Sequence, residues 1–103
     1  MLAGTVQSSL GLQQMQSWLQ QAGIVCELDG DEDELVLALA EANIVLRSGF
    51  KHEIIAVGDA QQERELLAAV KQLSVLLATQ SCAHEFELYD RLNQLIYELH
   101  HPA

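Results

Sequence analysis

Basic residues are scarce in this chain of 103 residues, and their scarcity argues against the partners that depend on them. Five Lys and Arg side chains stand against 15 carboxylates, which gives a formal net charge of −10. Proteins that bind nucleic acid directly use clustered cations to release counterions from phosphates, and anionic membranes also attract basic segments. We therefore expect neither direct nucleic-acid binding nor membrane binding. The bases are scattered along the chain: Arg47, Lys51, Arg64, Lys71 and Arg91.

Cysteines and long apolar runs are equally sparse. Cys26 and Cys82 are the only cysteines, and neither belongs to a C-x-x-C motif of the kind that zinc ribbons and thioredoxin-like proteins use. Each falls on an apolar stripe, where a free cysteine behaves as a small core residue. No apolar run approaches the roughly 20 residues of a membrane span, and no signal peptide is visible. The cytoplasm is the expected compartment.

The chain is rich in aliphatic residues. Half of its residues are apolar, and few of them are aromatic. The length suits one core and one domain. We predict a single α+β domain over residues 1–103, in which 1–7 form a loose N-terminus and 101–103 a loose C-terminus.

The first half of the chain reads as one helix followed by short strands. Apolar residues at three- and four-residue steps predict a helix from Ser8 or Ser9 to Ala22, closed by Gly23. The segment 34–46 is ambiguous, because Glu, Leu and Ala favour one helix while the alternation of leucines favours two strands. We prefer two strands. The predicted strands are 24–28, 34–40, 43–48 and 53–57.

The second half reads as two long helices joined by a short turn. One follows Asp59 and runs to about Thr79, and the other runs from Ser81 toward His100. The predicted fold class is therefore α+β. A small antiparallel sheet of three to four strands, at about residues 24–57, is covered by an N-terminal helix and two C-terminal antiparallel helices, in the order α-β-β-β-β-α-α.

The last predicted helix also suggests an interface. Leu88, Leu92, Leu95 and Leu99 follow heptad spacing, so one hypothesis is a homodimer formed through this helix. The alternative is that these leucines are used in the internal core. On the first helix, Trp18 and Met15 are more typical of a core than of an interface, although they could anchor a partner peptide.

An acidic run is the most conspicuous motif. Alternating carboxylates at Asp29, Asp31 and Asp33 begin like a calcium loop. However, Glu34 stands where that loop needs glycine, and Ala40 stands where it needs a bidentate glutamate. A solvated hairpin turn is the preferred interpretation, and no metal is expected. The run still offers an acidic contact region made of Asp29, Asp31, Glu32, Asp33 and Glu34.

No catalytic motif or cofactor-binding motif is found. The chain has no Gly-rich phosphate loop, no G-x-S-x-G and no H-E-x-x-H. The histidines are expected at the surface, and serines have no base beside them in sequence, although a triad assembled in space stays open. We expect no catalytic residues and no cofactor.

The expected helix–sheet–helix order, with its acidic balance, is broadly similar to small bacterial secretion chaperones and their sensory-regulator relatives. The similarity covers element order over most of the chain and implies a protein that holds or regulates another protein. The leading hypothesis is a non-enzymatic interaction domain: an adaptor, chaperone, inhibitor or regulator. It would bind its partner through a sheet edge or through the C-terminal helices. One alternative is an acidic mimic of nucleic acid that blocks a DNA- or RNA-binding protein. Another is a small enzyme whose site is assembled in space.

Overall fold

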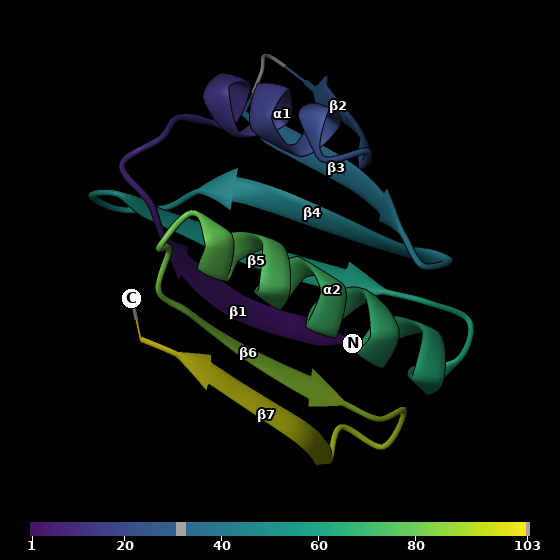
Figure 1. Ribbon diagram of the computed structural model, residues 1–103. Coiled ribbons are helices and arrows are strands. Elements are labelled where there is room, and N and C mark those ends of the chain that lie inside the picture. Colours follow the sequence, from purple (N-terminus) through teal and green to yellow (C-terminus); the bar gives the residue numbers. More distant parts are fainter. Residues whose placement is uncertain (31–32, 103) are drawn as a thin grey trace.

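One antiparallel sheet and two helices make up the computed structural model, which describes residues 1–30 and 33–102 (Figure 1). The strand order across the sheet is β2-β3-β4-β5-β1-β6-β7. Both helices, α1 (Leu12–Gln21) and α2 (Glu63–Thr79), lie on the same face of the sheet. The strands described are β1 (Leu2–Gln7), β2 (Val25–Asp29), β3 (Glu34–Leu39), β4 (Ala42–Ser48), β5 (Glu53–Asp59), β6 (His84–Tyr89) and β7 (Leu95–His101).

The predicted fold class is wrong in its sheet and its helices. The sheet has seven strands in the described residues rather than three or four, and two helices cover it rather than three. The ambiguous segment 34–46 does form two strands, β3 and β4, as preferred. Neither of the two described helices is long and apolar enough to cross a membrane.

The first error concerns residues 1–7, which were expected to be loose. Residues 2–7 form β1, which pairs with β5 on one side and β6 on the other. Leu2 and Val6 are fully buried. Between them, Gly4 faces Phe86, and a Cβ at Gly4 would collide with the Glu85 carbonyl and the Phe86 ring. A strand with glycine at its middle apolar position shows little periodicity in sequence.

The second error concerns residues 81–100, which form a hairpin rather than a helix. Along β6, the buried residues His84, Phe86 and Leu88 alternate with Glu85 and Glu87, which are more exposed. This is the period of a strand. The loop after β6 is fixed by Asp90, whose carboxylate accepts hydrogen bonds from the amides of residues 92 and 94. The heptad spacing of the leucines arises because two alternating strands are separated by this loop. At the end of the chain, His101 lies in β7, and residue 103 is outside the described residues.

The core lies between the sheet and the helices. α1 contacts β2, β3 and β4, and α2 contacts β4 and β6. Both cysteines are free and buried, as expected. Among the largest fully buried side chains are Phe86, Leu2, Met15, Leu19, Leu35, Leu37, Ile44, Leu46, Leu73, Leu77 and Leu88.

The turn between β3 and β4 has an unfavourable sequence for its geometry. Leu39 pairs with Ala42, which leaves a two-residue turn made of Ala40 and Glu41. Both have positive φ, 50° and 67°, as a type I′ turn requires. Side chains other than Asn, Asp and Gly are strained in this region, at a cost of about 1 kcal/mol each.

Replacing this turn with the favoured pair should therefore stabilise the fold. We predict that Ala40→Asn with Glu41→Gly raises the free energy of unfolding by about 1 kcal/mol, measured by urea denaturation. The control is Ala68→Gly on the exposed side of α2, which should lower it by about 1 kcal/mol. A turn variant less stable than the wild type would contradict the assignment of strain.

Candidate functional site

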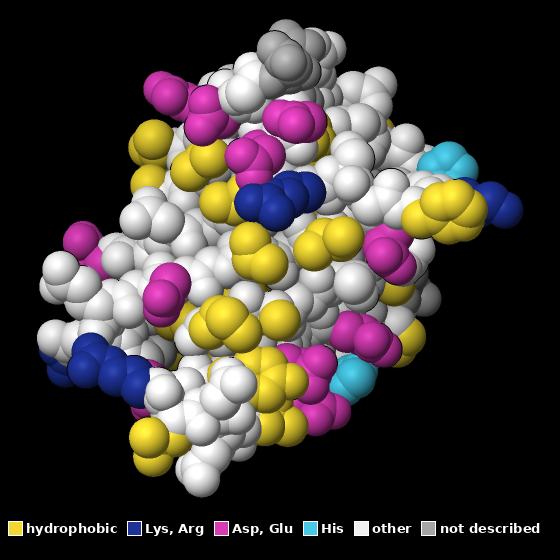
Figure 2. Space-filling model, turned by 180° about the vertical axis from the view of Figure 1, so that it is seen from behind, with side chains coloured by type: hydrophobic (Ala, Val, Ile, Leu, Met, Phe, Trp, Pro, Cys, Tyr) yellow, Lys and Arg dark blue, Asp and Glu magenta, His cyan; other side chains and the backbone are white. Residues whose placement is uncertain are grey.

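The face of the sheet opposite the helices is not covered by any described element, and we call it the open face (Figure 2). Its side chains alternate along each strand with those of the core. A line of apolar residues crosses it: Val36 pairs with Val45, Val45 with Val57, and Val57 with Ala3. We call these four residues the valine row. They occupy the four neighbouring strands β3, β4, β5 and β1.

An apolar row is unusual on this side of a sheet. Antiparallel sheets covered on one face commonly expose polar residues on the other. Here Val36, Val45 and Val57 are half-buried by their neighbours, while Val25 is 70% exposed and Ile55 is 40% exposed. Figure 2 shows a band of hydrophobic side chains across the middle of this face. The open face therefore presents apolar surface that the fold leaves in water.

Carboxylates lie at both ends of the valine row. Glu27 on β2 pairs with Val36, and Glu87 on β6 pairs with Ala3 and also with Glu98 on β7. Acidic side chains accordingly border the hydrophobic band in Figure 2. The strands described contain one Lys or Arg side chain, that of Arg47, and it forms an ion pair with Glu34. The border of the open face is thus strongly acidic.

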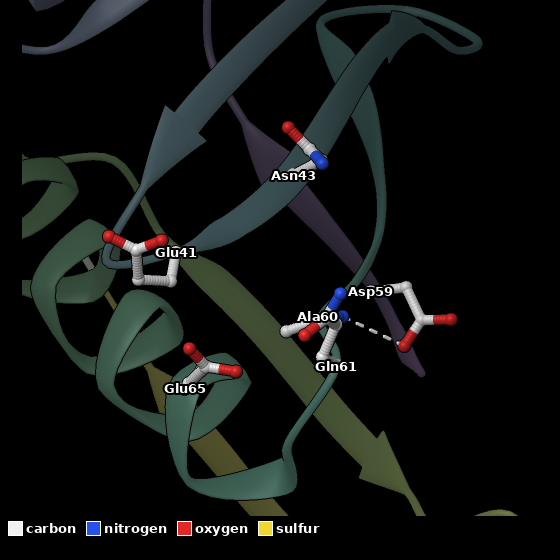
Figure 3. A pocket seen from close by; sticks show the side chains of 6 residues that line it. All are labelled: Glu41, Asn43, Asp59, Ala60, Gln61 and Glu65. Atoms are coloured by element: carbon white, nitrogen blue, oxygen red, sulfur yellow. Dashed lines mark hydrogen bonds between the residues drawn. The ribbon is translucent and has the colours of Figure 1, made fainter.

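A solvent-open hollow of about 450 Å³ lies beside the open face, where β4 begins and β5 ends near α2 (Figure 3). Asn43 and Asp59, a cross-strand pair, contribute to it from the sheet. Glu41 comes from the β3–β4 turn and Glu65 from the first turn of α2. The Asp59 carboxylate accepts a hydrogen bond from the Ala60 amide at 2.9 Å. No three His, Cys, Asp or Glu side chains in the described residues are arranged to hold a metal ion.

A second hollow, of about 560 Å³, lies at the opposite end of the strands. Glu53 and Glu85 line it, together with His100. The His100 ring lies 2.6 Å from a Glu98 oxygen and 3.2 Å from a Glu85 oxygen. These two carboxylates raise the pKa of His100, Glu98 having the larger effect. Acidic groups therefore border the valine row along the strands as well as across them.

The residues proposed as an interface from sequence do not form one surface. Met15 and Leu88 are in the core, and Trp18 and Leu99 are partly buried against it. Leu92 is 78% exposed and Leu95 is 47% exposed, both near the β6–β7 turn. Because residues 81–100 are not a helix, the predicted dimer helix does not exist.

The predicted acidic contact region lies at the β2–β3 hairpin. Asp29 pairs with Glu34 at the ends of β2 and β3, and Asp33 is exposed. Asp31 and Glu32 fall outside the described residues. The two strands that flank this run, β2 and β3, pair antiparallel.

Sequence reasoning missed a buried pair formed by Ser74 and His84. The Ser74 Oγ lies 2.6 Å from the His84 Nε2, and the His84 Nδ1 lies 2.9 Å from the Cys82 carbonyl oxygen. The Nδ1–H donates to that carbonyl, so Nε2 accepts from the Ser74 hydroxyl. His84 was expected at the surface, yet it is 2% exposed and stacks on His101, with ring centroids 5.2 Å apart. Ten residues and a change of element separate Ser74 from His84, so no local pattern shows the pair.

This pair resembles a serine activated by a histidine, but its position favours a structural role. The Ser74 side chain faces inward from α2, and its residue is 9% exposed. A substrate carbonyl would have to enter the layer between helix and sheet to reach it. The pair ties α2 to β6 by a hydrogen bond that leaves neither polar group unsatisfied.

Comparison with known proteins adds no identification: no family model, curated protein or solved structure matches this chain. The element order that suggested secretion chaperones is also not the order observed.

Burial of His84 should make stability depend on pH. Burial lowers the pKa of His84, and the neighbouring His101 lowers it further, while the hydrogen bond to the Cys82 carbonyl opposes this. The folded protein therefore releases this proton more readily than the unfolded chain, whose His titrates near about 6.5. The stability that neutral His84 contributes is complete above about pH 6.5, and it is lost as the pH falls toward the folded pKa.

We predict that the free energy of unfolding falls less between about pH 7.5 and pH 5 in His84→Gln than in the wild type. The control is His100→Gln. The raised pKa of His100 contributes stability below about pH 6.5 that is lost as pH rises through its folded value. The His100→Gln variant should therefore lose more free energy of unfolding than the wild type as the pH falls over the same range. Identical pH profiles for the wild type and His84→Gln would show that His84 is not the responsible group.

Proposed function

We propose that this protein is a non-enzymatic interaction domain that binds a partner protein across the open face of its sheet. The observation that carries the proposal is the valine row, an apolar line on four adjacent strands that the fold itself does not cover. Exposed contiguous apolar surface with a polar border is typical of protein–protein interfaces. The hypothesis of contact through C-terminal helices is replaced by this surface.

The size of the open face suits such a contact. Seven strands about 4.8 Å apart span about 29 Å, and six residues of a strand span about 20 Å. Their product is roughly 600 Å², close to the ~800 Å² that one partner buries in a standard interface. The apolar residues lie at the centre and the charges at the border, which is the usual arrangement in an interface.

The two alternatives have less support. A mimic of nucleic acid needs a continuous negative band, whereas here an apolar row separates Glu27 from Glu87. An enzyme would need an accessible nucleophile or base, whereas the Ser74–His84 pair found among the described residues is buried beneath α2.

Removing the apolar character of the valine row should abolish binding without harming the fold. We predict that Val45→Thr with Val57→Thr loses the partner, because threonine keeps the β-branched shape but presents a hydroxyl. The wild type and variants would be used as bait in a lysate of the source cells. Any retained protein would then be purified and its affinity for each bait measured, with a loss of at least about tenfold expected.

The matched control is Val75→Thr, an equally conservative change at a valine of α2 that is 65% exposed on the helix side. It should bind like the wild type. Equal affinity of all three baits for the same purified partner would contradict a role for the open face. So would a wild-type bait that retains no protein.

A further inference from the structure

The charges around the valine row identify the kind of partner that fits it. We propose that the partner docks an amphipathic segment in which apolar side chains are flanked on both sides by Lys or Arg. This inference rests on the proposed function and goes further, because an apolar partner of any charge would satisfy the function.

The first argument is the order of residues across the sheet. Read from β2 to β7, the central row is Glu27, Val36, Val45, Val57, Ala3, Glu87 and Glu98. In the next row, Asp29 on β2 and Glu85 on β6 lie toward the two sides of the sheet, and between them the Glu34 carboxylate on β3 is paired with Arg47 on β4. Negative charge thus stands on both sides of the apolar centre.

The second argument comes from the two hollows at the ends of the strands. Glu41, Asp59 and Glu65 line one, and Glu53 and Glu85 line the other. In Figure 3, Glu41 and Glu65 lie on one side of the first hollow and Asp59 on the other. A long Lys or Arg side chain that leaves the apolar centre toward either end of the strands meets a carboxylate. Such contacts set the orientation and the rate of docking more than the total affinity.

Spacing gives the segment its dimensions. Five strand intervals separate Glu27 from Glu87, a distance of about 24 Å for strands about 4.8 Å apart. An extended segment covers that distance in about seven residues, and a helix covers it in about 16. The cations should therefore lie at the two ends of the segment with the apolar side chains between them.

A second copy of this chain does not fit as the occupant. Placing the open face on its own copy by a twofold axis brings an acidic border against an acidic border. The net charge of −10 adds repulsion between whole molecules. Arg47 offers little compensation, because it is already paired with Glu34.

The test uses three synthetic peptides of equal length. The first has a leucine centre with lysines at both ends, the second replaces the lysines with glutamates, and the third has the composition of the first in a scrambled order. Binding to the full chain is followed by amide chemical shifts in NMR, which also locate the contact. We expect the first peptide to perturb Val36, Val45 and Val57 and to bind at least about tenfold more tightly than either of the others.

Two variants with matched controls separate the charge from the apolar centre. Glu27→Gln should weaken binding of the first peptide about threefold at low ionic strength. The control Glu63→Gln removes the same charge on the helix side, from α2, and should leave the binding unchanged. Salt at roughly 0.3 M should abolish the difference between them. Val45→Thr with Val57→Thr should strongly weaken binding of the first peptide at either salt concentration, whereas Val75→Thr should leave its binding unchanged.

Four outcomes would overturn the inference. Equal binding of the first and scrambled peptides would show attraction by net charge alone. Preference for the glutamate peptide would reverse the charge assignment. A concentration-dependent dimer whose shifts fall on the valine row would make a second copy the occupant. If a purified natural partner binds the valine row with no dependence on salt or on Glu27, this inference fails while the proposed function stands.

Discussion

The insertion of β1 between β5 and β6 is the constraint on which the rest of the structure depends. β1 supplies one of its edges to β5 and the other to β6, so without it the sheet would divide into a four-stranded and a two-stranded part. A two-stranded hairpin is at best marginally stable alone in water. Gly4 permits the close approach of Phe86, and Leu2 and Val6 join the core on the same side. The valine row extends from Val57 to Ala3 only because β1 occupies this place.

The helix layer depends on the same insertion. α2 contacts β4 and β6, which lie on opposite sides of the β5–β1 pair, so it spans the junction that β1 creates. The hydrogen bond between Ser74 and His84 ties the helix to β6 on the far side of that junction. With both helices on this face, the other face remains open. The arrangement that builds the core on one face of the sheet therefore also leaves the candidate site exposed on the other face.

The parts of the fold that sequence reasoning predicted correctly are those with local signals. The two helices and the strands β2 and β3 each follow a regular period, and β4 and β5 contain short runs of apolar residues. The β6–β7 hairpin was misread because the leucines at 88, 92, 95 and 99 match heptad spacing, although His84, Phe86 and Leu88 alternate. Periodicity over a short window does not distinguish two strands and a loop from one helix. β1 gave almost no signal, because pairing with distant strands, not local pattern, makes it a strand.

The candidate site could be predicted only in part. The acidic residues of the segment 29–34 were recognised, but which of them share a face with Glu27 depends on the register of β2 and β3. The valine row comes from strands in four parts of the chain, so no sequence window contains it. In isolation, Val36 and Val45 read as core residues of buried strands. Only the placement of both helices on one side leaves them facing solvent.

The place of β1 in the sheet has a consequence for synthesis of the chain. β1 leaves the ribosome well before its neighbours β5 and β6, and β6 comes after α2. Until β5 is made both edges of β1 are unpaired, and until β6 is made one edge remains unpaired, a condition that favours pairing with other chains. Contacts between distant parts of a sequence also form slowly. The nascent chain thus carries an incompletely paired strand until β6 has been synthesised, and the pairing of β6 with the second edge of β1 removes this risk of association.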